Sequence, residues 1–503
     1  MPTQVYSASL GANVIVLEGE KLKTYPLDTR PEWSFGRQDP SGVRKMPDIA
    51  VSSKIVSRMH GWFQTSGGVW YFTDNVDNTN GTYHNGKKID RPIPGQSISV
   101  RLRYGDVLRV DTAEFDNTND QAVLLFFTTA EEKGIWSSYS LAGRQSVVIG
   151  RDPSCNIVEP LPYLSGRHCR IDFSQNSWWL TDCGSTAGTF LNGMAVTEPT
   201  RLHEKDCISL CDCSFFFLGN RLLYAQRGSV AAKAEIRKAA PDRRPMILRA
   251  RIQTKQVKSN TGHGKKELIR DINIDIREGS LVALLGTAGA GKSTVMNCLN
   301  GMDLTGVRGS VKFRGVDLMR NFDQMKYLIG SVPQKKVFHP SFTPEEEFRQ
   351  AAMLRLPADT SPAEIQARVD RTLEMLSMTG VRTNRNSKLS GGEQTRVNVG
   401  IELVADRDFL CLDEPDQGLS PNYKHELFEI LRNLAHKHGK SVLSIIHDVS
   451  EIDLFDQVIM LAKVDGVGRL AFSGSPEQAR EFFGCDIRDA YALLERDPGR
   501  FVR

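Results

Sequence analysis

Residues 286–294 read Gly-Thr-Ala-Gly-Ala-Gly-Lys-Ser-Thr, after the apolar run 281–285 and before a segment with helical spacing that starts at Val295. This order predicts a strand, a glycine loop and a helix, with backbone N–H groups and the positive helix end facing a phosphate group. A chance turn and a dinucleotide fingerprint are the alternatives, and the fingerprint fits less well because the glycines continue into Lys-Ser-Thr. The candidate phosphate-binding residues are Gly286, Gly289, Gly291, Lys292, Ser293 and Thr294, of which Ser293 is placed to bind Mg²⁺.

Acidic and polar residues suited to nucleotide chemistry lie at three places further along the chain. The run 409–412 ends in Asp413 and Glu414, which places one carboxylate for Mg²⁺ and a second to orient or deprotonate an attacking water. Gln334 supplies an amide that can sense water, Mg²⁺ or a terminal phosphate, and His447 can hydrogen-bond that phosphate. The candidate catalytic residues are Lys292, Gln334, Glu414 and His447, and the candidate Mg²⁺ ligands are Ser293, Gln334 and Asp413.

Residues 389–394 read Leu-Ser-Gly-Gly-Glu-Gln and open a helical stretch. With the preceding motifs in this order, about half of the chain resembles an ATP-binding cassette (ABC) transporter ATPase. The resemblance implies ATP and Mg²⁺ as ligands. It also implies that Ser390, Gly391 and Gly392 contact the ATP of a second cassette, since a helix N-terminus preceded by small residues can approach a phosphate closely. One cassette per chain then implies a homodimer.

Finer motifs are similar to the half-size (G-like) exporter subfamily of ABC transporters. They are the segments 288–294, 342–346 and 468–476 and the Glu393 variant of the signature. Thr343-Pro and Ser361-Pro, each followed by a glutamate at the third helical position, predict capped helices in an inserted helical subdomain at about 340–400. In the family this insert docks the membrane partner.

The chain departs from the family pattern at two places. Ser420 follows Gly418-Leu419, where the family usually has an aspartate. This change predicts altered communication between the two paired ATP sites. Val257 lies near the place of the adenine-stacking aromatic residue, which predicts weaker recognition of the base.

Composition limits the class of protein. The chain has 503 residues, a net charge of +4 and 25% charged residues, which suits about three soluble domains and does not suggest a nucleic-acid partner. We find no signal peptide and no run of the roughly 18–20 apolar residues that a membrane-spanning helix needs. Nine cysteines without paired spacing argue against a disulfide framework, and Cys207, Cys211 and Cys213 are interpreted as thiols of a strand pattern rather than metal ligands.

The N-terminal half contains a repeat. His60 and His168, 108 residues apart, are each followed by a tryptophan after ten residues and an aspartate after fourteen, and then by a Gly-Thr pair and an Asn-Gly turn. Short alternating strands with many turn residues predict two small β-sandwiches.

The first repeat resembles a forkhead-associated (FHA) domain, a β-sandwich family that binds phosphothreonine. The residues that carry the resemblance and form the candidate phosphopeptide site are Arg37, Ser57, Arg58, Thr79 and Asn80. A forked arginine with nearby hydroxyl groups suits a phosphate with nearly two negative charges. In the second repeat Gly166 and Ala187 replace the arginine and the asparagine, so phosphate binding and a packing role are both left open there.

The expected fold is multidomain, with two all-β FHA-like sandwiches followed by an α/β P-loop ABC ATPase domain with a helical subdomain. The expected bounds are 1–128, 129–226, a basic linker at 227–246, and 247–503. The expected function is the ATP-hydrolysing subunit of an exporter with a separately encoded membrane permease, located on the cytoplasmic face of the membrane. A phosphothreonine protein, marked by a Ser/Thr kinase, would regulate it. The alternative is a soluble, phosphorylation-responsive signalling scaffold in which the cassette is a nucleotide-dependent dimerisation switch.

Overall fold

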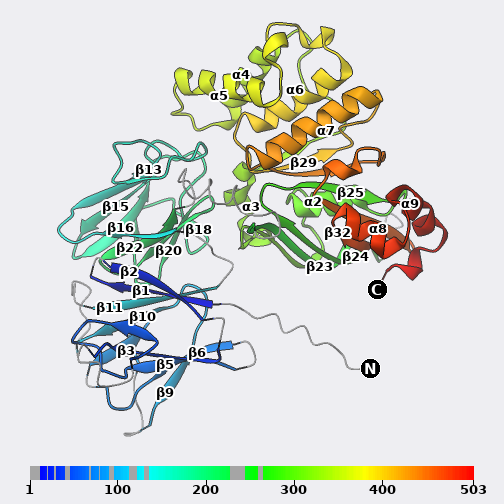
Figure 1. Cartoon of the computed structure of the whole chain (residues 1–503). Helices are drawn as coiled ribbons and strands as arrows, with labels where there is room; N and C mark the ends of the chain where they lie inside the picture. Colours follow the sequence, from blue (N-terminus) through cyan, green and yellow to red (C-terminus); the bar gives the residue numbers. More distant parts are fainter. Residues whose placement is uncertain are drawn as a thin grey trace.

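The computed structural model of the chain contains two all-β domains and one α/β domain (Figure 1). It describes residues 12–19, 21–27, 30–39, 46–66, 69–78, 80–89, 96–112, 122–129, 135–226, 244–258 and 264–502. Thr79 and most of the linker predicted at 227–246 lie outside these residues.

Two stacked sheets form the first all-β domain, with strand orders β2-β1-β11-β10-β7-β8 and β4-β3-β5-β6-β9. Alternating apolar residues bury a core between the sheets, including Phe35, Phe63 and Phe72. The strands are β1 (Ala12–Glu18), β2 (Lys21–Pro26), β3 (Glu32–Arg37), β4 (Ile49–Val51), β5 (Gly61–Ser66), β6 (Val69–Asp74), β7 (Gly81–His84), β8 (Lys87–Lys88), β9 (Ile98–Arg101), β10 (Val107–Asp111) and β11 (Val123–Thr129).

The second all-β domain has the sheet orders β12-β22-β21-β20-β17-β18 and β14-β13-β15-β16-β19. Its second sheet repeats the order of β4-β3-β5-β6-β9, so the two predicted sandwiches are confirmed. The strands are β12 (Ile135–Ser140), β13 (Ser146–Gly150), β14 (Ile157–Val158), β15 (Cys169–Ser174), β16 (Ser177–Asp182), β17 (Phe190–Leu191), β18 (Met194–Ala195), β19 (Thr200–Arg201), β20 (Cys207–Leu210), β21 (Cys213–Phe217) and β22 (Arg221–Gln226).

Both Asn-Gly pairs form the predicted hairpin turns. Asn85 and Gly86 join β7 to β8 with φ of 51° and 77°, and Asn192 and Gly193 join β17 to β18 with φ of 52° and 84°. Positive φ at both turn residues is the geometry that asparagine and glycine tolerate best.

One mixed sheet of ten strands organises the C-terminal domain, in the order β27-β26-β23-β24-β32-β31-β25-β30-β29-β28. Strand β25 is parallel to both β30 and β31, and β28, β29 and β30 are parallel to one another, so their carboxyl ends share one edge. The strands are β23 (Met246–Lys258), β24 (Lys265–Arg277), β25 (Leu281–Gly286), β26 (Val307–Phe313), β27 (Val316–Asp317), β28 (Ile329–Val332), β29 (Phe409–Asp413), β30 (Ser441–Ile445), β31 (Gln457–Val464) and β32 (Val467–Gly474).

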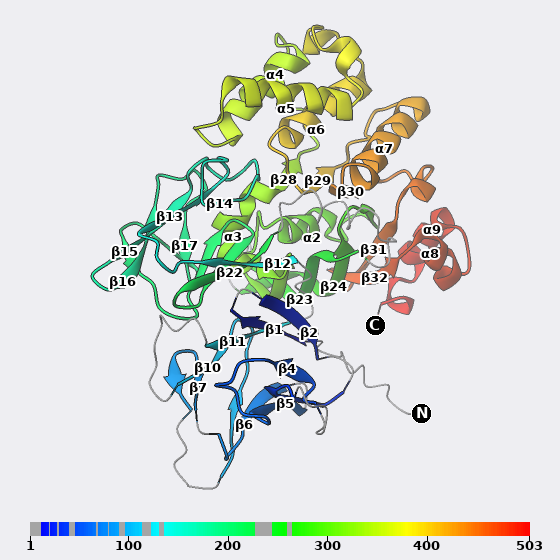
Figure 2. The ribbon, with the colours of Figure 1, turned by 60° about the vertical axis from the view of Figure 1, so that its left-hand side comes forward.

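Helices cover this sheet and extend beyond β28 and β29, where α4, α5 and α6 form a separate layer (Figure 2). The predicted capping boxes are confirmed, with Thr343 and Glu346 at α4 and Ser361 and Glu364 at α5. The helices are α2 (Lys292–Leu299), α3 (Leu318–Met325), α4 (Pro344–Arg355), α5 (Pro362–Met375), α6 (Gly391–Leu403), α7 (Pro421–His436), α8 (Pro476–Phe483) and α9 (Ile487–Arg496), with short 3₁₀ turns η2 (Lys326–Leu328), η3 (Thr379–Val381), η4 (Asn386–Lys388), η5 (Ile452–Leu454) and η6 (Pro498–Arg500).

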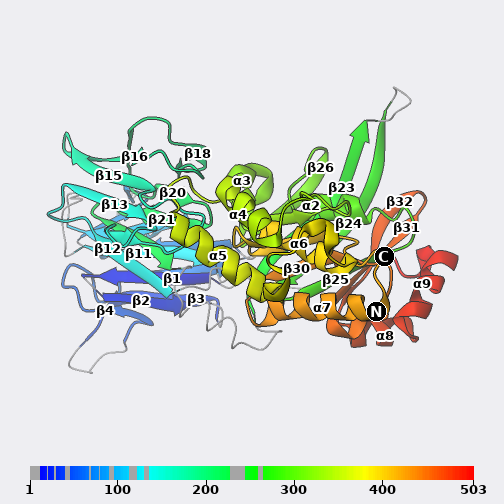
Figure 3. The same ribbon diagram turned by 90° about the horizontal axis from the view of Figure 1, so that it is seen from above.

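The two all-β domains lie on one side of the α/β domain (Figure 3). The first all-β domain packs on the second through an apolar cluster, in which the rings of Phe126 and Phe216 are 4.5 Å apart. The second all-β domain and the α/β domain share one continuous cluster of buried apolar residues that runs from Leu141 to Leu461. None of the helices in the described part of the chain has the length and apolar character that crossing a lipid bilayer requires.

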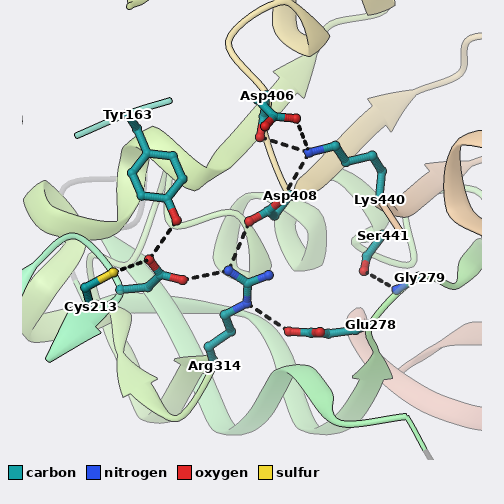
Figure 4. A network of polar contacts seen from close by, with 10 residues as sticks. Tyr163, Cys213, Glu278, Gly279, Arg314, Asp406, Asp408, Lys440 and Ser441 are labelled. Atoms are coloured by element: carbon teal, nitrogen blue, oxygen red, sulfur yellow. Dashed lines mark hydrogen bonds and ion pairs between the residues drawn. The ribbon is translucent and has the colours of Figure 1, made fainter. Parts of the chain in front are cut away.

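A buried polar network joins the second all-β domain to the α/β domain (Figure 4). Arg314 donates to Asp212 of the second all-β domain at 2.7 Å, to Glu278 at 2.8 Å and to Asp408 at 3.0 Å. Tyr163 also donates to Asp212, at 2.8 Å. Burial lowers the pKa of Arg314, but the charges of Glu278, Asp408 and Asp212 outweigh it and hold that pKa well above its usual value. The guanidinium group therefore stays charged and links two domains.

Candidate functional site

The glycine loop, residues 286–291, connects β25 to α2 as the sequence predicts. Its last residue, Gly291, is the N-cap of α2 with φ of 84°, a left-handed conformation that favours glycine. Gly291 has no side chain to cap the helix, and the first turn of α2 carries no acidic residue. The N–H groups of that turn are thus left for an external anion, and phosphate fits this donor set.

Lys292 lies at the start of α2 and points back over the glycine loop. Its Nζ donates to the carbonyl of Gly286 at 2.9 Å. Burial lowers the pKa of Lys292, although the nearby charges of Glu414 and Asp413 oppose that shift. Ser293 is exposed in the same turn and Thr294 is partly buried. The positive charge and a hydroxyl group are therefore on the side of the loop where phosphates would bind.

Glu414 is the centre of a polar cluster at the carboxyl edge of the sheet. Gln334 donates to its Oε2 at 2.9 Å, and His447 Nε2 is 2.7 Å from its Oε1. The backbone φ of Glu414 is 48°, an uncommon conformation for a residue with a side chain. Three residues predicted from separate motifs thus meet, since Gln334 and His447, 80 and 33 positions from Glu414, both contact its carboxylate.

Asp413 precedes Glu414 at the end of β29 and is half-buried. Burial and the charge of Glu414 raise the pKa of Asp413, while His447 and Lys292 act in the opposite direction. A divalent cation would relieve the repulsion between the two adjacent carboxylates. The oxygen donors of Asp413, Ser293 and Gln334 suit Mg²⁺, which prefers hard ligands.

The signature residues lie in a different place, at the start of α6. Ser390 is the N-cap of α6 and forms a capping box with Glu393. Gly391 is exposed, whereas Gly392 is buried against the ring of Tyr423. The structure therefore places these three residues together at the N-terminal end of α6.

Two residues of the site were not found from the sequence. Gln417 accepts from Gln334 at 2.9 Å and donates to Glu414 at 3.2 Å, so it completes the cluster. Tyr491 on α9 accepts a hydrogen bond from the N–H of Gly286 at 2.9 Å and supports the base of the glycine loop. Gln417 lies three residues after Glu414, close enough to that motif to be found from the sequence. Tyr491 is not near any of the motifs.

A second candidate site is a pocket of about 420 Å³ at one end of the first all-β domain. Arg37, Ser57, Arg58 and Asn80 line it, as the sequence predicts. Asn80 donates to the carbonyl of Ile55 at 2.6 Å and orders the loop. Among the described residues that line the pocket, Lys54 adds a third positive charge and Asp77 is acidic.

His60 is fully buried beneath this pocket and braces its loops. Its Nδ1 accepts from the N–H of Ser57 at 3.2 Å, and its Nε2 is 2.8 Å from Thr82 Oγ1. Gly36 permits the close approach of β3 to the loop, because a Cβ at this position would lie 2.1 Å from the carbonyl oxygen of Arg58. The Gly36-Arg37 pair therefore brings the arginine side chain to the pocket.

Comparison with known families agrees with this geometry. Residues 269–417 match the ABC transporter family, and residues 33–111 and 147–211 match the FHA domain. The chain carries an ABC ATPase domain preceded by two FHA domains. The ABC domain is an ATP-binding, ATP-hydrolysing module, and the sequence is distantly related to the G family of ABC transporters.

Several known proteins are similar to this chain. The ABC transporter ATP-binding/permease protein Rv1747 of Mycobacterium tuberculosis is 32% identical over 70% of this chain and 38% of its own length. ABC transporter G family member 19 of Arabidopsis thaliana is 31% identical over 44% of this chain and 31% of its own length. The chain thus spans 38% and 31% of the length of these two relatives. The dimeric post-hydrolysis structure of the ATP-binding cassette MJ0796 with ADP and Pi is 23% identical, covers 45% of this chain and 98% of that one, and has a TM-score of 0.39.

The second FHA domain repeats the frame of the first. The N–H of Arg151 donates to Ser165 as that of Arg37 does to Ser57, at 3.1 and 2.9 Å. The N–H of Ser165 donates to Nδ1 of the buried His168 at 3.2 Å. Burial lowers the pKa of His168, so this histidine is a neutral brace at neutral pH.

Proposed function

We propose that this chain is the ATP-hydrolysing subunit of an ABC exporter, that a separately encoded permease provides the membrane pathway, and that phosphothreonine binding by the first FHA domain regulates it. The observation that supports it best is the convergence of Gln334, His447 and Gln417 on Glu414, at the same sheet edge as Lys292. These three contacts fix the orientation of the Glu414 carboxylate, which can then accept a proton from water.

The proposed chemistry divides between these residues. The glycine loop and Lys292 hold the β- and γ-phosphates of ATP, and Glu414 orients the attacking water and accepts its proton. Gln334 and His447 hold the Glu414 carboxylate and contact the terminal phosphate. Bound Mg²⁺, with Ser293 and Asp413 as ligands, would neutralise charge on the phosphates.

Ser390 and Gly392 are proposed to act on the ATP of a second copy of the chain. The support is that both lie at the N-terminal end of α6, where a helix carries partial positive charge. Each site would then be completed by the positive end of the partner's helix.

The first FHA domain is proposed to bind phosphothreonine on a protein marked by a Ser/Thr kinase. Arg37→Ala is expected to weaken the binding of a phosphothreonine peptide about 10- to 100-fold, because it removes a charge-assisted hydrogen bond to phosphate. Titration of the full chain with the tightest peptide from a phosphothreonine library measures this. The basal ATPase rate should not change.

Arg101→Ala is the matched control, since Arg101 is an exposed arginine on β9 that does not line the pocket. It should leave peptide affinity unchanged. Equal affinity for the wild-type chain and the Arg37→Ala variant would reject the pocket as the phosphate site.

The permease is tested by isolation of the chain from detergent-solubilised native membranes. A polytopic membrane protein at a stoichiometric ratio is the expected result, and it is supported by the mycobacterial relative, which is an ATP-binding/permease protein. Recovery of phosphothreonine proteins alone would instead support the signalling scaffold.

A further inference from the structure

The loop end of the second FHA domain faces the helical layer of the ABC domain, near α4 and α5 (Figure 1). Asp359, in the loop between α4 and α5, accepts a hydrogen bond from the N–H of Gly166 at 2.5 Å. The same carboxylate pairs with Nη2 of Arg151 at 3.3 Å, and Arg151 Nη1 also pairs with Glu364 at the start of α5. The carboxylate of Asp359, from the ABC domain, thus lies against the loops of the second FHA domain.

These donors correspond to the phosphate-binding positions of the first FHA domain. Arg151 and Ser165 occupy the places of Arg37 and Ser57, with the same backbone hydrogen bond and the same histidine brace. Gly166 follows Ser165, where the first domain has Arg58. Because Gly166 has no side chain, the loop of the ABC domain can approach its backbone closely. The carboxylate of Asp359 therefore lies where a phosphate would meet the arginine and the loop amides.

Thr186 of the second FHA domain contacts two further parts of the ABC domain. Its hydroxyl accepts from the N–H of Ala358 at 3.3 Å, and its carbonyl accepts from the hydroxyl of Tyr327 at 3.0 Å. Tyr327 lies just before β28, the strand that leads to Gln334. The FHA loops therefore contact both the helical layer and the turn before β28, the strand that leads to Gln334.

The contact of the second FHA domain with Asp359 and Glu364 is more exposed than the Arg314 network that also joins this domain to the ABC domain. Asp212 in the Arg314 network is fully buried, whereas the side chains of Asp359 and Glu364 are each 45% exposed. Exposed ion pairs contribute little to stability and are screened by salt. The FHA domain is thus attached at its base through buried groups and at its loops through carboxylates that water and competing ligands can reach.

We propose that Asp359 is an internal ligand of the second FHA domain, a carboxylate in the place of phosphate, and that a phosphothreonine peptide competes with it for Arg151 and the loop amides. The contact of Asp359 with the second FHA domain is independent of the proposed function. Only an effect of its release on ATP hydrolysis rests on that function.

Hydrogen–deuterium exchange of the full-length chain tests the contact. Asp359→Ala should speed exchange at Gly166 about tenfold, because the N–H loses a charged acceptor. Asp323→Ala is the matched control, since Asp323 is exposed on α3 and pairs with Lys326 of the same segment. Unchanged protection at Gly166 in the Asp359→Ala variant would overturn the proposal.

A synthetic peptide tests the competition. It carries the loop sequence 354–363 with phosphothreonine at the position of Asp359, and its unphosphorylated twin is the control. In an Arg37→Ala background, Asp359→Ala should raise phosphopeptide affinity at least about tenfold, because a tethered ligand acts at millimolar effective concentration. A further Arg151→Ala change should abolish that gain.

Equal phosphopeptide affinity with and without Asp359, or equal binding of the twin, would contradict the proposal. Neither measurement requires ATP turnover. A chain with no ATPase activity but with the Asp359 effects intact would reject the proposed function and keep the internal ligand.

Discussion

Glu414→Gln is expected to bind ATP with unchanged affinity and to hydrolyse it about 100- to 10,000-fold more slowly. The amide keeps the size of the carboxylate and its contacts with Gln334 and Gln417, but it cannot accept a proton from water. Release of inorganic phosphate measures turnover, and a fluorescent ATP analogue measures binding. Because hydrolysis no longer separates paired subunits, ATP should also shift the variant from monomer to dimer in size-exclusion chromatography.

Glu429→Gln is the matched control for this variant, because Glu429 is an exposed carboxylate on α7 that pairs with His425 on the same helix. It should hydrolyse ATP at the wild-type rate. If the Glu414→Gln variant retained full turnover, the base would have to be another residue of the cluster. If it lost turnover but stayed monomeric with ATP, the role of Ser390 and Gly392 in a second subunit would be rejected.

Arg314→Ala is expected to lower the free energy of unfolding by about 3–5 kcal/mol, because it leaves buried carboxylates without their cation. Asp212 is fully buried, and Asp408 and Glu278 are nearly so, so water cannot replace the guanidinium group fully. Urea unfolding, followed by tryptophan fluorescence, measures the loss. The transition should move to lower urea without a change in the first FHA domain.

Arg432→Ala provides the comparison, since Arg432 is exposed on α7. Its unfolding transition should match that of the wild type. A loss for Arg314→Ala no larger than that of the control would show that the network does not stabilise the joint between the domains.

Local patterns predicted much of the structure. The glycine loop, the capping boxes at Thr343 and Ser361, and the Asn-Gly hairpins each depend on residues within a few positions of one another. The meeting of Gln334, Glu414 and His447 was also predictable, because each follows a strand and parallel strands bring their carboxyl ends to one edge.

Contacts between distant segments could not be predicted. Tyr491 and Gly286 are 205 residues apart, and Arg151 and Asp359 are 208 apart. No periodicity marks a tyrosine or an aspartate for such a partner, since the pairing depends on how whole domains dock. For the same reason the sequence left open whether the second FHA domain binds phosphate or packs, and it gave no sign of Arg314 as a bridge.

The apolar cluster shared by the second FHA domain and the ABC ATPase domain has a practical consequence. Its members come from both sides of residue 246, the place where a sequence-based boundary would invite truncation. In a fragment that begins there, apolar side chains that are buried in the intact chain would be exposed to water, and such surfaces promote aggregation. Recombinant work on the ATPase should therefore retain both FHA domains, because the first is packed in turn on the second through the cluster around Phe126 and Phe216.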